Sequence, residues 1–134
     1  MNDLRLCIEA EVFPTEDERK VERAIKNLFP TVELRVVRVT EDRASFVGES
    51  QGIKVLSRFR DLLKRERIRA AARSMMISSL LNSCLTIHLN KQAAYAGHVS
   101  FATDPRESPL GPIKLSLECV EPHSVIKWLV ETEQ

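Results

Sequence analysis

The sequence has few of the residues on which phosphate-binding loops and disulfide frameworks depend. It contains four glycines and three cysteines in 134 residues. It has no GxGxxG or GxxxxGK(S/T) motif for a nucleotide phosphate and no GxSxG motif for a nucleophilic serine. The cysteines, Cys7, Cys84 and Cys119, form no CxxC pair, which favours reduced structural thiols in the cytoplasm. We therefore predict a cytoplasmic protein that is not an enzyme, with no catalytic residue and no cofactor.

Long apolar runs and clustered metal ligands are also missing. No apolar run approaches the length of about 18 residues that a membrane span requires, and acidic residues interrupt the N-terminal segment where a signal peptide would be apolar. His88 and His98 are predicted to face outward on paired strands, but no third ligand stands at a suitable spacing, so we predict no metal site. Aromatic residues make up only 5% of the sequence, which argues against an aromatic platform for stacking bases. We expect neither a membrane nor a small-molecule substrate as partner.

The composition is that of one globular domain. Apolar residues make up 43% and charged residues 29% of the sequence, and no linker or repeat divides it. We therefore predict a single domain over residues 1–134. The net charge is +1, but residues 1–50 carry a net −3 and residues 51–134 a net +4. This asymmetry favours a negatively charged partner for the second half of the chain.

Alternation of apolar and polar residues predicts a largely antiparallel sheet. Period-two alternation is typical of strands with one buried and one solvated face. Six strands are predicted, at Leu4–Val12, Val32–Val39, Ala44–Glu49, Cys84–Asn90, Tyr95–Phe101 and Ile113–Val120. Thr15 is the predicted N-cap of the first helix, Pro122 lies in the first turn of the last one, and Lys91 lies at the tip of a hairpin. The fold class that follows is α+β, a two-layer sandwich with a mainly antiparallel sheet of about six strands and helices on one face.

The most basic part of the sequence runs from Leu56 to Met76. It carries seven basic residues, six of them arginine, and two acidic ones. The planar guanidinium group of arginine suits contact with phosphates and stacking on unpaired bases. One interpretation is that this stretch forms a basic helical surface for a polyanion. The other is that its long side chains cover the backs of helices and pair with acidic residues elsewhere.

The same stretch contains two apolar stripes that would lie on opposite sides of one straight helix. The first is centred on Phe59, Leu62 and Leu63, and the second follows residue 68. Either the chain bends near residues 65–67 into two helices, which we favour, or it stays straight and its second stripe contacts another subunit. The second alternative predicts an interface formed by Ile68, Ala72, Met75 and Met76.

Several runs of residues carry a family resemblance over essentially the whole chain. They include Ala10-Glu11-Val12-Phe13-Pro14, Arg58-Phe59-Arg60-Asp61-Leu62-Leu63, Leu89-Asn90-Lys91-Gln92-Ala93-Ala94 and Pro109-Leu110-Gly111-Pro112-Ile113. With these runs the sequence resembles a family of small archaeal proteins of uncharacterised function. The resemblance implies a fold similar to that of the large-subunit ribosomal protein L-five. It also implies an RNA-binding role that is sometimes linked to the archaeal exosome.

The leading functional hypothesis is therefore a non-catalytic protein that contacts the backbone phosphates of RNA and takes part in archaeal RNA processing. The residues predicted to make these contacts are Arg58, Lys64, Arg65, Arg67, Arg69, Arg73 and Lys91. The alternative is a protein-interaction module, a homodimer or a subunit of an RNA-processing complex, that does not bind RNA directly. Its surface would be the stripe from Ile68 to Met76.

Overall fold

The structure, a computed structural model, describes residues 3–102 and 110–131 and contains one five-stranded sheet. The strands are arranged in the order β2-β3-β1-β5-β4, and all four neighbouring pairs are antiparallel. The elements in chain order are β1 (Arg5–Val12), α1 (Glu18–Leu28), β2 (Leu34–Arg38), β3 (Ala44–Gln51), η1 (Ile53–Leu56), α2 (Ser57–Arg65), α3 (Arg69–Ser79), β4 (Cys84–Asn90), α4 (Lys91–Tyr95), β5 (Pro112–Glu118) and α5 (Pro122–Val130). The predicted α+β class is confirmed, with five strands in place of six.

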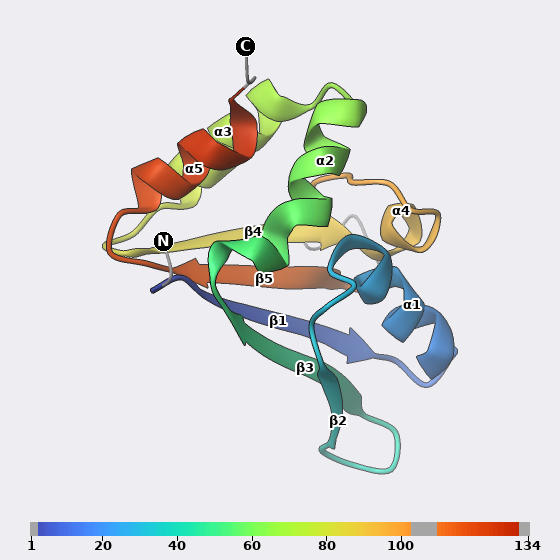
Figure 1. Ribbon diagram of the computed structural model, residues 1–134. Helices are drawn as coiled ribbons and strands as arrows, with labels where there is room; N and C mark the ends of the chain where they lie inside the picture. The colour runs from blue at the N-terminus through green and yellow to red at the C-terminus, as the bar shows by residue number, and fades with distance from the viewer. Residues whose placement is uncertain (1–2, 103–109, 132–134) are drawn as a thin grey trace.

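The helices pack on one face of the sheet, as Figure 1 shows. β1 is the central strand, and its apolar residues alternate with polar ones, so that Leu6 and Ile8 are fully buried while Glu9 is exposed. The same alternation in β4 and β5 places Ile87 and Leu115 in the core beneath the helices. The alternation in the sequence therefore determined which face of the sheet is covered.

The first helix begins at a different residue from the one predicted. Asp17, not Thr15, is the N-cap of α1, and its side chain accepts a hydrogen bond of 2.9 Å from the backbone N–H of Arg19. Glu16 turns back and accepts a hydrogen bond of 3.1 Å from the backbone N–H of Phe13. The carboxylate of Glu16 is thereby directed toward the interior, where it meets another predicted site residue, described below.

The predicted strand Tyr95–Phe101 is wrong. Asn90 caps a short helix, α4, by accepting a hydrogen bond of 2.9 Å from the backbone N–H of Ala93. The chain then returns along the outer edge of β4, but its pairing there is reduced to one isolated bridge between Leu89 and Phe101. The alternation after residue 95 predicted a strand, whereas the capping residue that starts α4 shortened the returning segment.

The basic stretch forms two helices, which confirms the favoured alternative. α2 ends at Arg65 and α3 begins at Arg69, and the turn between them has Arg67 in the left-handed region at φ 59°. The backbone N–H of Ile68 reaches back to the carbonyl of Leu63 over 3.2 Å and closes the corner. Because the chain bends here, both apolar stripes are buried in the same core. None of the helices among the described residues is long and apolar enough to cross a membrane.

Candidate nucleic-acid interface

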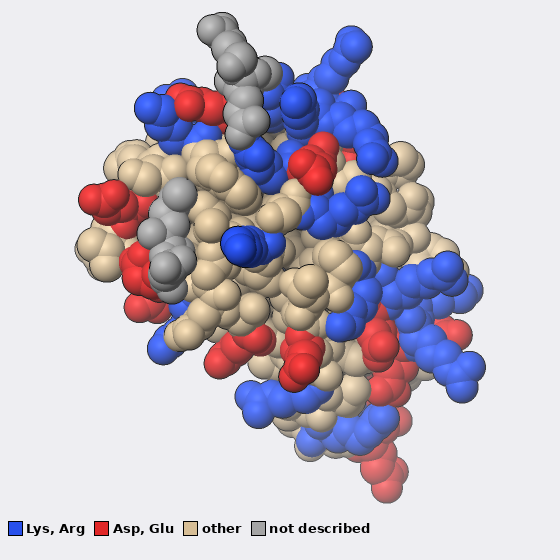
Figure 2. All heavy atoms as spheres, in the orientation of Figure 1, with Lys and Arg blue, Asp and Glu red and all other residues tan. Residues whose placement is uncertain are grey.

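Six basic side chains lie on α2, on the corner between α2 and α3, and on the first half of α3. We call this set the basic corner, and it consists of Arg58, Lys64, Arg65, Arg67, Arg69 and Arg73. Lys64, Arg65, Arg67 and Arg73 are exposed, whereas Arg58 and Arg69 are half-buried. Lysine and arginine side chains gather over the part of the molecule where α2 ends and α3 begins, at the upper right in Figure 2. The bend thus brings together cations that a straight helix would have placed on opposite sides.

None of the six has an ion-pair partner within residues 3–102 and 110–131. The acidic residue of the corner, Glu66, faces elsewhere: it accepts a hydrogen bond of 3.1 Å from the backbone N–H of Val99 and lies 3.2 Å from Nδ1 of His98. The interpretation that these arginines only pair with acidic residues is therefore not supported by the described part of the chain. Their charge remains available to a partner molecule.

Arg60, the seventh basic residue of the stretch, has a structural role. Its Nε donates a hydrogen bond of 2.9 Å to the carbonyl of Trp128, and its guanidinium carbon lies 4.7 Å from the centre of the Trp128 ring. These contacts join α2 to α5. Nη1 of Arg69 is buried without a hydrogen-bond acceptor among the described residues.

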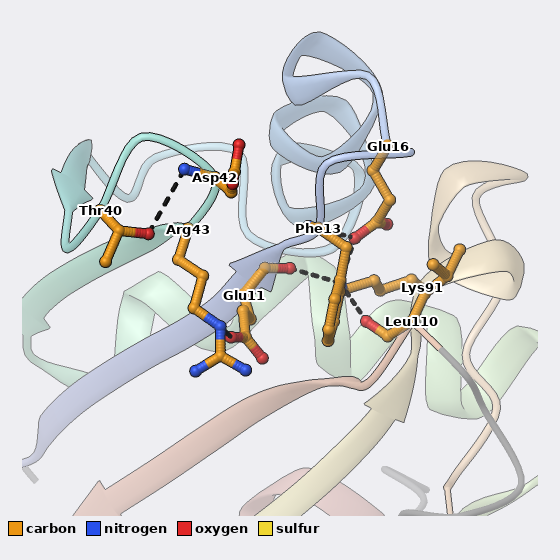
Figure 3. A network of polar contacts seen from close by, with 8 residues as sticks. All are labelled: Glu11, Phe13, Glu16, Thr40, Asp42, Arg43, Lys91 and Leu110. Atoms are coloured by element: carbon orange, nitrogen blue, oxygen red, sulfur yellow. Dashed lines mark hydrogen bonds and ion pairs between the residues drawn. The ribbon is translucent and has the colours of Figure 1, made fainter.

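Lys91 is not at an exposed hairpin tip, so this prediction is wrong. The residue is 5% exposed and its Nζ donates to the carbonyls of Glu11 and Leu110 and, over 2.9 Å, to the carboxylate of Glu16 (Figure 3). Its ammonium also lies 5.4 Å from the centre of the Phe13 ring. All three of its N–H donors are therefore used inside the protein. No donor is left for a phosphate, and we remove Lys91 from the candidate interface.

The sequence contained one signal that pointed to this arrangement. Asn90 is a favourable helix N-cap residue, so a helix beginning at Lys91 was an alternative to a tight hairpin. A lysine in the first turn of a helix that follows a buried strand lies close to the sheet. Its acceptors, however, come from β1, the segment before α1 and the segment before β5. No pattern in the sequence relates these distant segments.

The predicted subunit interface is also contradicted in part. Ala72 and Met76 are completely buried within this chain, where α3 packs against α5 and β4. Ile68 and Met75 are half-buried, and Ile68 packs against the same core. Ala72 and Met76 therefore cannot contact a second subunit while the chain keeps this fold. The stripe from Ile68 to Met76 is mainly a core stripe because the corner turns it inward.

Two cysteine thiols of the described residues have pKa values opposite to those of an activated nucleophile. Burial raises the pKa of the Cys7 and Cys119 thiols, so both stay protonated at neutral pH, opposite to a reactive thiolate. The backbone N–H of Val120, which donates a hydrogen bond of 2.7 Å to Asp3, lowers the pKa of that exposed carboxyl group. In the part of the chain that the structure describes, no group of three or more potential metal ligands comes together.

A groove that sequence reasoning missed lies next to the basic corner. It has a volume of about 760 Å³ and is bounded by α3 and α5. Arg73 contributes one side, and His123 and Lys127 contribute the other. The two sides come from segments that are 50 residues apart, so only the packing of α5 on α3 brings them together.

The fold and this surface define a small α+β domain with a concentrated cationic face, the type of surface that contacts polyanions. A family model described as RNA binding matches residues 5–118, and the chain belongs to that family. Its relatives include a UPF0201 protein of Sulfurisphaera tokodaii, 42% identical over 93% of this chain and 86% of the relative. A UPF0201 protein of Aeropyrum pernix is 40% identical over 94% of this chain and 84% of the relative.

A solved structure shares the fold. The crystal structure of the UPF0201 protein of Methanococcus jannaschii matches with a TM-score of 0.85 and 29% identity, and the match covers 95% of this chain and 99% of that one. These findings confirm the resemblance to an uncharacterised archaeal family.

Proposed function

We propose that this protein binds RNA without catalysing a reaction, by contacting backbone phosphates with the basic corner, and that it acts in archaeal RNA processing. The observation that carries the proposal is the group of six cations without ion-pair partners in the described part of the chain. Their clustering concentrates positive potential in a protein whose net charge is only +1. The family model described as RNA binding supports RNA as the polyanion.

The physical basis is counterion release together with the geometry of arginine. Each cation that neutralises a phosphate releases condensed counterions, so affinity falls as salt rises. Five of the six residues are arginine, whose planar fork contacts two phosphate oxygens at once. The alternative hypothesis is an assembly module acting through the stripe from Ile68 to Met76. Ala72 and Met76 are buried in this chain, which leaves Ile68 and Met75 as the half-buried residues of that stripe.

The test is the salt dependence of RNA binding, measured by fluorescence anisotropy with a labelled RNA. If about five phosphates are contacted, log affinity should fall with log salt at a slope of about −3.5 for a single strand and about −4.5 for a duplex. Replacing the exposed residues Arg65, Arg67 and Arg73 with Gln should reduce the slope to about −1.4 for a single strand and about −1.8 for a duplex. Affinity near 0.1 M salt should fall roughly 100-fold.

The matched control replaces three other exposed arginines, Arg19, Arg23 and Arg35, with Gln. This variant loses the same net charge, but from α1 and β2, so its RNA affinity should stay within about threefold of the wild type. A flat salt dependence of the wild-type protein, or equal losses in the two triple variants, would contradict RNA binding by the basic corner.

A further inference from the structure

The groove between α3 and α5 has a small apolar part among polar and charged side chains. α3 and α5 lie side by side, as Figure 1 shows, and pack against each other. Ile77 of α3, which is 40% exposed, and Val130 of α5 give the groove an apolar part. Arg73 and Lys127, both exposed, stand beside them. An apolar surface within reach of two cations suits a ligand that is itself both apolar and anionic.

The two cations of the groove are available for binding. Arg73 has no ion-pair partner among the residues that the structure describes. Lys127 forms an ion pair of 3.7 Å with Glu131, but the two side chains are 69% and 59% exposed. A pair so exposed to water contributes little to stability, so Lys127 can exchange Glu131 for a phosphate. The groove therefore offers a phosphate two partners, one from each helix.

The groove adjoins the basic corner through Arg73. Arg73 belongs to both, and Arg69 precedes it by one turn of α3, about 6 Å along the helix axis. A nucleic-acid backbone that follows the corner is thereby led to the groove. Glu131, on the α5 side, would repel a phosphate but can accept a hydrogen bond from a base amino group. This arrangement favours a base on the apolar part of the groove with its phosphate within reach of Arg73 and Lys127.

We propose that this groove binds an unpaired nucleotide, so that the RNA recognised by this protein is single-stranded. The proposal rests on the proposed RNA binding and specifies its substrate class. A duplex keeps the faces of its bases stacked inside and presents phosphates and sugars to a protein, so it gains nothing from an apolar groove. A single strand can turn a base out, and contact with its face is available to every base type. Ile77 is then a specificity-determining residue for single strands.

The test compares one labelled RNA of mixed sequence as a single strand and annealed to its complement, by fluorescence anisotropy. The wild-type protein should bind the single strand more tightly. Replacing Ile77 with Ser keeps the charge and should lower single-strand affinity about fivefold while leaving duplex affinity within about twofold. Lys127→Gln should also weaken single-strand binding more than duplex binding. The matched control is Val39→Ser, at a valine that is 70% exposed and lies outside the groove.

Two results would overturn the proposal and leave RNA binding by the basic corner intact. One is equal affinity of the wild-type protein for the single strand and the duplex. The other is an unchanged single-strand affinity of Ile77→Ser while the triple arginine variant still loses binding. If the wild-type protein binds neither RNA, the proposed function itself fails. If the protein elutes as a dimer that Ile77→Ser converts to a monomer, the groove is assigned to a second copy of the chain and the proposal is overturned.

Discussion

Replacing Lys91 with Met removes a buried ammonium group and keeps most of the side-chain stem. In the wild-type protein this group satisfies the carbonyls of Glu11 and Leu110 and the carboxylate of Glu16. The Glu16 side chain is only 9% exposed, so in the variant its charge loses its partner in a place that water hardly reaches. The variant therefore removes one donor from three acceptors in one small region, and it leaves the Glu16 carboxylate with only the hydrogen bond from the backbone N–H of Phe13.

The expected loss in the free energy of unfolding is about 3 to 5 kcal/mol, the range found when one partner of a buried ion pair is removed. The unfolding entropy of a 134-residue domain is about 0.28 kcal/mol/K, from about 2.1 cal/mol/K per residue. The melting temperature should therefore fall by about 10 to 18 °C.

The measurement is guanidinium unfolding followed by circular dichroism, with Lys54→Met as control because Lys54 is exposed. The control should lie within about 0.5 kcal/mol of the wild type. Lys91→Met combined with Glu16→Gln should be less destabilised than the two single changes added together, since it leaves no unpaired charge. RNA affinity should not change in the folded Lys91→Met protein. A loss of stability below about 1 kcal/mol together with weaker RNA binding would refute the buried network and restore Lys91 as a phosphate contact.

Two further predictions concern the backbone. Gly48→Ala should lower stability by about 1 to 3 kcal/mol in the same unfolding measurement, because the added Cβ would lie 2.7 Å from Cγ1 of Val32 and 3.1 Å from the carbonyl of Glu33. Unchanged stability would mean that β2 and β3 are packed less closely than the structure shows. Arg67→Gly should raise stability by about 0.5 to 1 kcal/mol, because residue 67 has φ 59°, a conformation that glycine adopts without strain. The same change should weaken RNA binding and reduce the salt slope by about 0.7 to 0.9. If stability and RNA affinity both rise, or both fall, the role of Arg67 as a phosphate contact in a left-handed turn is contradicted.

Only the part of the candidate site that is marked by local charge could be predicted from the sequence. The six residues of the basic corner were identified because arginine is concentrated between residues 58 and 73. Lys91 was assigned to the same site as the charge at a predicted hairpin tip. That assignment failed because its burial depends on acceptors from three other segments of the chain. The groove could not be predicted, because Lys127 reaches it only through the packing of α5 against α3. Charge along the chain is local information, whereas burial and grooves depend on long-range contacts.

The sequence by itself determined the fold class, the covered face of the sheet and the two apolar stripes around the basic stretch. Those features follow from the periods of strands and helices, which act over a few residues. The tertiary structure decided where the two apolar stripes pack. The bend at Arg67 turns both into one core, which buries Ala72 and Met76 and leaves Arg65 and Arg73 exposed around the same corner. The direction of that bend comes from packing against α5 and the sheet, and no glycine or proline in the sequence marks it.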